Sequence, residues 1–186
     1  MGGGMHAKIA LALTLLLGAG ACARTEPPVT TDTWKRFSSS DGRFSILFPV
    51  DPVEKVDTYS DQGRAVLIHR FMANVDRYEY EVDYADFNRE PREAFNWLEQ
   101  EFWSRVGKES RVVFKGDFEL DGNPGYEIEV ETPAGNRIRW KFLAVDGRLY
   151  QFGTRRPATT PDRGDVTLFM GSFELTPATA TSPQRR

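Results

Sequence analysis

The chain has 186 residues, 40% hydrophobic and 12% aromatic, which suits one domain with a packed core plus appendages. Its formal net charge of −3 comes with no basic stripe, which argues against nucleic acid as a partner. A single cysteine excludes an intrachain disulfide and a zinc site built on several cysteines.

Residues 1–21 have the features of a secretory signal. Lys8 precedes an apolar run from Ile9 to Leu17, which is shorter than a membrane-spanning helix. Small residues then lead to Cys22, in a context that resembles a bacterial lipobox, although Ala19 replaces the usual leucine. We therefore expect export and a lipid on Cys22 that anchors the chain to the membrane of the bacterial cell envelope. The alternative is a secreted protein in which Cys22 is incidental.

The rest of the chain divides by composition. Residues 22–33 contain two prolines and no apolar period, which predicts a short extended tether. Residues 34–176 are expected to form a single domain. Residues 177–186 are rich in Pro, Ala, Thr and Ser and predict a disordered tail.

Short strands with turn signals dominate the first part of the domain. Asp41-Gly42 predicts a turn between two strands within residues 34–49, and further strands are expected over residues 53–58, 65–75 and 78–87. In the last of these, tyrosines and a valine share one face, while Glu79, Glu81 and Asp83 share the other. We interpret the acidic face as solvated.

Residues 91–106 predict one long amphipathic helix. Its apolar stripe consists of Ala94, Phe95, Leu98, Phe102 and Val106, at helical spacing. A proline suits the first turn and Gly107 suits the end. We expect this helix to lie on the sheet with Phe95 and Phe102 buried.

Residues 111–120 predict a strand, and the hairpin that follows is the most regular pattern in the chain. Residues 126–131 alternate apolar and acidic side chains, and residues 137–142 alternate basic and apolar ones. A three-residue loop, Pro133-Ala134-Gly135, sets Glu131 opposite Arg137, Glu129 opposite Arg139 and Glu127 opposite Lys141.

The end of the domain suggests that both sheet faces are covered. A two-residue turn at Asp146-Gly147 would place Gln151 opposite Phe142, which conflicts with a sheet that is apolar on one face only. Either the loop is longer or the second face is also packed. A helix with Thr160 as N-cap and a stripe from Val166 to Phe173 favours the second option.

These features together resemble the Mog1/PsbP-like fold. The resemblance rests on the lipobox-like cysteine, on residues 37–49, 78–84, 146–150 and 169–175, and on the intervening helix. It implies an α+β fold: an antiparallel β-sheet with a long helix on one face and a C-terminal helix on the other, an α/β/α sandwich. The family includes bacterial lipoproteins, the PsbP subunit of photosystem II and the Ran-binding protein Mog1. No family functional residue matches a position here.

No group of residues predicts a catalytic, cofactor or metal site. His69 is the only histidine beyond the leader, so we interpret it as a packed or edge residue. The acids Glu79, Glu81, Asp83 and Asp86 could form a calcium-binding surface cluster, but a solvated strand face is the simpler interpretation.

The leading functional hypothesis is a non-enzymatic envelope lipoprotein that binds a protein partner near the membrane. Trp97 and Trp103 fall off the main helix stripe and are the candidate partner contacts. The second hypothesis is a small-molecule or ion binder that uses a cleft between helix and sheet. The third is a hydrolase that depends on carboxylates alone. A pocket with converging Glu or Arg side chains would favour the second or third.

Overall fold

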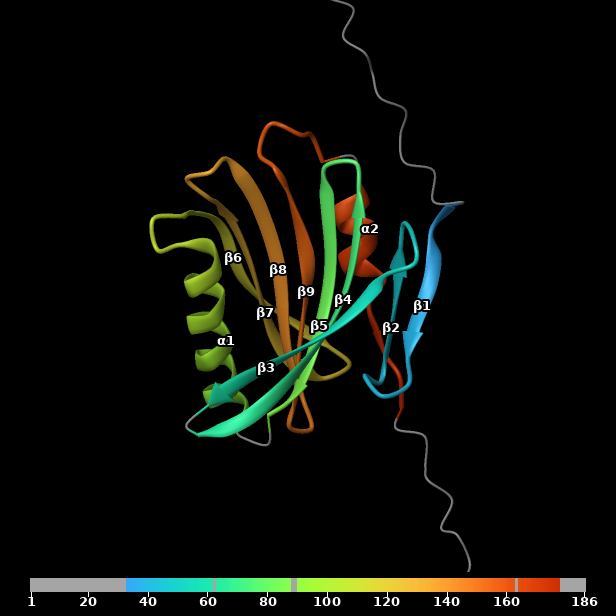
Figure 1. The fold of residues 1–186 in the computed structure, drawn as a ribbon, viewed down its shortest axis with the longest axis vertical. Helices are drawn as coiled ribbons and strands as arrows, with labels where there is room; N and C mark the ends of the chain where they lie inside the picture. Colours follow the sequence, from blue (N-terminus) through green and yellow to red (C-terminus); the bar gives the residue numbers. More distant parts are fainter. Residues whose placement is uncertain (1–32, 62, 88–89, 163, 178–186) are drawn as a thin grey trace, which may run out of the picture.

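The computed structural model describes residues 33–61, 63–87, 90–162 and 164–177 (Figure 1). The predicted signal, Cys22 and nearly all of the tether and tail lie outside these residues. Within the described part, no helix is long and apolar enough to cross a membrane. The elements are β1 (Lys35–Ser39), β2 (Phe44–Phe48), β3 (Val53–Asp61), β4 (Arg64–Val75), β5 (Tyr78–Asp86), α1 (Pro91–Val106), β6 (Arg111–Leu120), β7 (Asn123–Glu131), β8 (Asn136–Val145), β9 (Arg148–Pro157), α2 (Asp165–Gly171) and β10 (Glu174–Leu175).

Two antiparallel sheets form most of the described structure. The large sheet has seven strands in the order β3-β4-β5-β9-β8-β7-β6, and the small sheet has the order β1-β2-β10. Strands β3 and β6 are therefore the two edges of the large sheet. In Figure 1 the small sheet lies at the β4–β5 side of the large sheet, and α1 lies at the opposite side beside β6, β7 and β8.

The register of the β7–β8 hairpin is the predicted one. Glu131 pairs with Arg137, Glu129 with Arg139 and Glu127 with Lys141. Gly135 has a φ of 75°, a left-handed conformation that suits glycine at the end of this loop.

The β8–β9 turn has the minimal two residues, so Phe142 does lie opposite Gln151. Of the two explanations for this register, the structure shows the second: the other face of the sheet is packed. Phe152 is 1% exposed, and its ring stacks on Phe173 with 4.2 Å between centroids.

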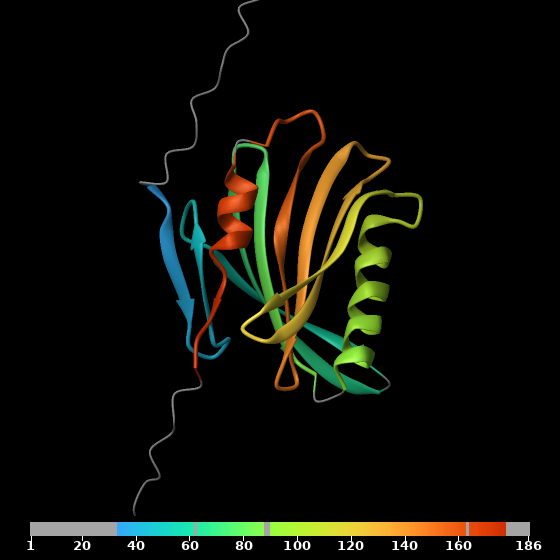
Figure 2. The same cartoon turned by 180° about the vertical axis from the view of Figure 1, so that it is seen from behind.

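The buried apolar residues form two clusters, which alternate along the strands. Leu149 belongs to one cluster and its neighbour Tyr150 to the other, as expected when successive side chains point to opposite faces. The first cluster includes residues of the small sheet and of α2, and the second includes residues of α1. Figure 2 shows α2 beside the small sheet.

Helix α1 has the predicted bounds, but its buried stripe is shifted. Ala94, Leu98 and Phe102 are buried, at spacings of four residues. The prediction for Phe102 is confirmed, whereas that for Phe95 is wrong. Phe95 is only partly buried because it lies at the side of the helix, where its ring meets the edge of Tyr126 at 5.6 Å.

Helix α2 begins at Asp165, so the prediction of Thr160 as its N-cap is wrong. Gly164 has a φ of 92°, which no residue inside an α-helix can adopt, and it stands at the N-cap. The helix is therefore only seven residues long and shares its cluster with the small sheet. The fold is mostly antiparallel β-structure with two helices, so the sheets dominate more than the predicted α/β/α sandwich implies.

Candidate functional site

The acidic face of β5 is buried beneath α1. Glu81 is 2% exposed and Asp83 is 1% exposed, so the interpretation of this face as solvated was wrong for both residues. The alternation was read correctly, because the tyrosines of β5 face the other cluster. The alternation alone does not predict that helix α1 covers the acidic face of β5.

Arg70 of β4 forms ion pairs with three acidic side chains from the two strands beside it. Its guanidinium lies 2.8 Å from Asp57, 2.8 Å from Glu81 and 3.2 Å from Asp83. The Gln151 amide of β9 also donates a hydrogen bond to Asp83. Arg70 is directly opposite Asp83 in the pairing of β4 with β5, so the two side chains lie next to each other on the same face of the sheet.

Helix α1 adds a second cation to this group. Arg105 donates to the Glu81 carboxylate at 3.1 Å and lies over the Trp140 ring at 5.3 Å. The helix is thus joined to the sheet by charge as well as by its apolar stripe. We call Arg70, Glu81, Asp83, Arg105 and Gln151 the buried charge cluster.

The proton affinities of the acids reflect their burial. Burial raises the pKa of Asp83 well above its usual range and the charge of Glu81 adds to this, while Arg70 opposes it. Burial also raises the pKa of Glu79, again with a contribution from Glu81. Loss of water around the carboxylates therefore outweighs the attraction of the arginines at these two positions.

A small cavity lies between the buried charge cluster and the side of α1. Its lining includes Tyr59, Arg70, Asp83, Trp97 and Arg105, and its free volume is about 20 Å³. That volume holds about one water molecule. A second space of about 100 Å³ lies nearby and shares Arg105 and Gln151 with the first.

The two candidate tryptophans lie on different sides of α1 and do not form one surface. They are six positions apart in the helix, which places them about 120° apart around its axis. Trp97 is partly buried against Tyr59 and Phe87 and lines the cavity. Trp103 is also partly buried, but it borders an open depression lined by Asn96, Glu99, Gln100, Ser104 and Lys108.

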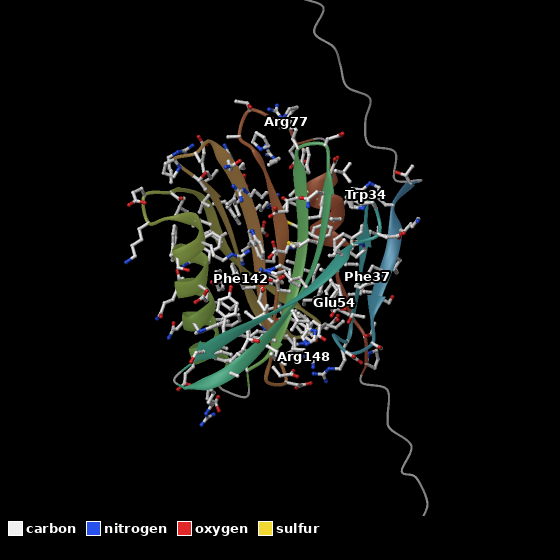
Figure 3. All side chains as sticks on the ribbon, viewed as in Figure 1. Trp34, Phe37, Glu54, Arg77, Phe142 and Arg148 are labelled. Atoms are coloured by element: carbon white, nitrogen blue, oxygen red, sulfur yellow. The ribbon has the colours of Figure 1, made fainter. Side chains whose placement is uncertain are left out.

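His69 is a packed residue near the sheet edge, as predicted. Its Nδ1 lies 3.1 Å from Glu54, and its ring stacks on Tyr84 at 4.6 Å. Arg148 also lies against the Tyr84 ring and binds Asp86 at 2.6 Å. Figure 3 labels Glu54 and Arg148 on this part of the sheet.

The arrangement around Arg148 holds the small sheet in place. Arg148 donates to the Asp41 carbonyl, and the Tyr150 hydroxyl donates to the Gly42 carbonyl at 2.8 Å. Both carbonyls belong to the turn between β1 and β2. Among the described residues, no group of three or more His, Cys, Asp or Glu side chains is placed to hold a metal ion.

Comparison with solved structures shows which known fold this chain resembles. The chain is similar to cyanobacterial PsbP (CyanoP) from Synechocystis sp. PCC 6803, with a TM-score of 0.52 and 14% sequence identity. The match covers 84% of this chain and 98% of that one. No family model and no curated protein matches the sequence. The likeness therefore shows a PsbP-like fold and nothing about activity.

Proposed function

We propose that this chain is an exported, lipid-anchored envelope protein whose domain binds a protein partner rather than catalysing a reaction. The anchor rests on the leader and on Cys22 in its lipobox-like context. The partner surface is the outer side of α1 around Trp103. The observation that carries this assignment is a partly exposed tryptophan at the border of an open, polar depression.

Trp103 suits such a contact for a physical reason. Tryptophan combines a large apolar area with one N–H donor, and it is frequent among the residues that dominate binding energy. Amide and hydroxyl groups from Asn96, Gln100 and Ser104 surround it. These groups offer both donors and acceptors, which suit the backbone and polar side chains of a protein surface.

The partner surface can be tested in the envelope itself. A photoreactive residue at Gln100, which is exposed, should crosslink one defined partner, and Trp103→Gln should abolish that crosslink. The matched control carries the photoreactive residue at Thr167, an exposed position of α2, and should not crosslink this partner. Equal crosslinking from both positions, or no effect of Trp103→Gln on a folded domain, would contradict the proposal.

The anchor has its own test. A Cys22→Ser variant should lose acyl labelling and be either released or retained with its leader uncleaved. Recovery of wild-type protein from the periplasm with an unmodified thiol would show that Cys22 is not lipidated.

A second candidate function is supported by the buried charge cluster. A buried carboxyl with a raised pKa, such as Asp83, gains from an additional positive charge. A small cationic ligand could supply that charge if Trp97, which lines the cavity, moved aside. The cavity as it stands holds only about one water, which is smaller than the substrate of a hydrolase.

This second function can be tested with methylammonium as the probe. In a Trp97→Ala variant, methylammonium chloride should raise the melting temperature relative to sodium chloride at equal ionic strength. The same variant with Asp83→Asn should show no difference between the two salts. An equal response of both variants would rule out binding at Asp83.

A further inference from the structure

Strand β6 is an edge of the large sheet with an unusual exposed surface. Val112, Val113 and Phe114 are consecutive, and they are 46%, 39% and 47% exposed. An exposed apolar edge strand offers unpaired backbone groups to another strand. The other edge, β3, also exposes two valines, Val53 and Val56, but Glu54 and Lys55 separate them, so it lacks a run of consecutive apolar residues.

A bulge divides β6 into two parts. Val113 has no partner in β7, so the register shifts between Val112 and Phe114. From Phe114 to Leu120 the strand is regular. Lys115 points to the α1 side, where it binds Glu99 at 2.8 Å, so Asp117 points to that side too and Phe114, Gly116 and Phe118 point to the other.

We propose that β6 pairs with β6 of a second copy of this chain, antiparallel and centred on Gly116. In that register Gly116 faces its own counterpart. Lys115 faces Asp117 of the second copy, and Phe114 faces Phe118. The Lys115–Asp117 and Phe114–Phe118 contacts each occur twice because the two-fold axis exchanges the copies.

Charge complementarity selects this register over its neighbours. A centre at Lys115 would set Lys115 against itself, and a centre at Asp117 would set Asp117 against itself. Like charges directly opposite each other destabilise a strand pair, whereas opposite charges stabilise it. Only centres on a residue keep each side chain on its own face, so half-residue shifts are not available.

The glycine at the centre leaves space for the phenylalanines. In the single chain the Phe114 ring lies over Gly116, where an added Cβ would meet it at 2.8 Å. In the dimer, two Phe114–Phe118 pairs would enclose the two glycines and remove the exposed Phe114 rings from water. Aromatic rings paired across a strand in this way compensate for glycine in an edge.

The geometry of the rest of the molecule permits this pairing. The small sheet lies at the other side of the large sheet, away from β6 (Figures 1 and 2). A two-fold axis perpendicular to the sheet keeps both α1 helices on one face of the joined sheet. Pairing uses the β6 edge of each copy, so the assembly closes as a dimer at this edge.

Charge exchange tests the pairing on the protein purified in detergent. Wild-type protein should have a dimer mass in light scattering. Lys115→Asp sets the introduced carboxylate against Asp117 of the other copy, twice in each dimer, and the dissociation constant should rise about tenfold or more. Adding Asp117→Lys to that variant reverses both charges and should restore the dimer.

A cysteine pair tests the register. A mixture of Lys115→Cys and Asp117→Cys chains should form a covalent dimer on oxidation faster than either chain alone. Circular dichroism checks that each variant is folded. A monomeric wild type, a Lys115→Asp/Asp117→Lys variant that stays monomeric although folded, or equal crosslinking in all mixtures would each overturn the proposal. Trp103→Gln should leave the mass unchanged, so failure of the partner surface and failure of the dimer are distinguishable.

Discussion

On one face of the large sheet, α2 and the small sheet pack through aromatic rings, whereas on the other face α1 packs through both apolar side chains and buried charges. Phe44 on the first face is fully buried and has ring contacts with Phe37, Phe71, Tyr84, Tyr150 and Phe173. On the second face, Arg70 and Arg105 reach Glu81 within the same layer as Leu98 and Phe102. The first layer is therefore held mainly by aromatic packing, together with the Arg148 contacts to the β1–β2 turn, whereas the attachment of α1 depends on buried acids.

This contrast teaches how each layer can respond. Close-packed rings resist displacement because any movement opens a void. Buried ion pairs add less net stability, because desolvation offsets their attraction, but their strength changes with proton or ligand binding. The α1 layer is thus the part of the domain that solution conditions or a ligand can loosen.

The largest effect is expected in the aromatic layer. Phe44→Ala should lower the free energy of unfolding by about 3–5 kcal/mol, because it removes a fully buried ring and leaves a cavity. Phe102→Ala should fall in the same range, since this residue of α1 is buried between the helix and the large sheet. Urea denaturation measures both. Phe95→Ala is the matched control and should cost less, because Phe95 is only partly buried.

A large loss of stability is also expected when Arg70 is removed from the buried charge cluster. Arg70→Met should cost about 3 kcal/mol, because it leaves Glu81 and Asp83 buried without their main cation. Asp83 can take up a proton, which limits the loss. Adding Asp83→Asn to Arg70→Met should recover part of the stability in urea denaturation. If Arg70→Met alone unfolds like the wild type, the cluster does not stabilise the α1 layer.

Acids on both faces of the large sheet give stability a pH dependence of predictable sign. The folded state raises the pKa of Asp83, so between its ordinary and its raised value the folded state binds more protons than the unfolded state. This contribution to stability is lost as pH rises through the raised pKa. Asp57 and Asp86 act in the opposite sense, because their pKa values are lowered by Lys55 and Arg148 and their contribution is lost as pH falls.

Asp83→Asn separates the two effects. The variant should lose the fall in stability with rising pH and keep the loss at low pH, as measured by urea denaturation over a pH series. Glu79, which has a raised pKa as well, contributes a smaller fall of the same sign. A wild-type stability that rises steadily through the whole acidic range would contradict the assignment.

Local patterns predicted the hairpin and the bounds of α1, but not the start of α2. The β7–β8 register was predictable because charge alternation, apolar alternation and Gly135 all favoured one pairing. The start of α2 was not, because the favourable cap at Thr160 is followed by Gly164 in a left-handed conformation. The order of the sequence motifs and the positions of the turn glycines suggested a PsbP-like fold, and the comparison with solved structures supports that fold.

The buried charge cluster was missed because alternation shows which side chains share a face and not what covers that face. Glu81 and Asp83 read as ordinary outward acids beside their tyrosine neighbours. One signal could have located the cluster: apart from His69 beside it, Arg70 is the polar residue in the apolar stretch from Ala65 to Ala73 of β4, the strand expected to precede β5. A charge in such a stretch usually has a buried partner.

The smallest effect, and the finest test of the contrast, concerns Arg105. Its side chain is 37% exposed, and Glu81 keeps its contact with Arg70 when Arg105 is removed, so Arg105→Gln should cost only about 0.5–1 kcal/mol. The loss should be local, because Arg105 is a link between α1 and β5 and touches nothing in the aromatic layer. Hydrogen exchange should therefore speed up for α1 amides and stay unchanged for α2 amides. Glu93→Gln, in the first turn of the same helix, is the matched control for a change of charge on α1 outside the cluster. Faster exchange in both helices would mean that the two faces open together, and the distinction between a ring-packed layer and a charge-linked layer would then have no dynamic counterpart.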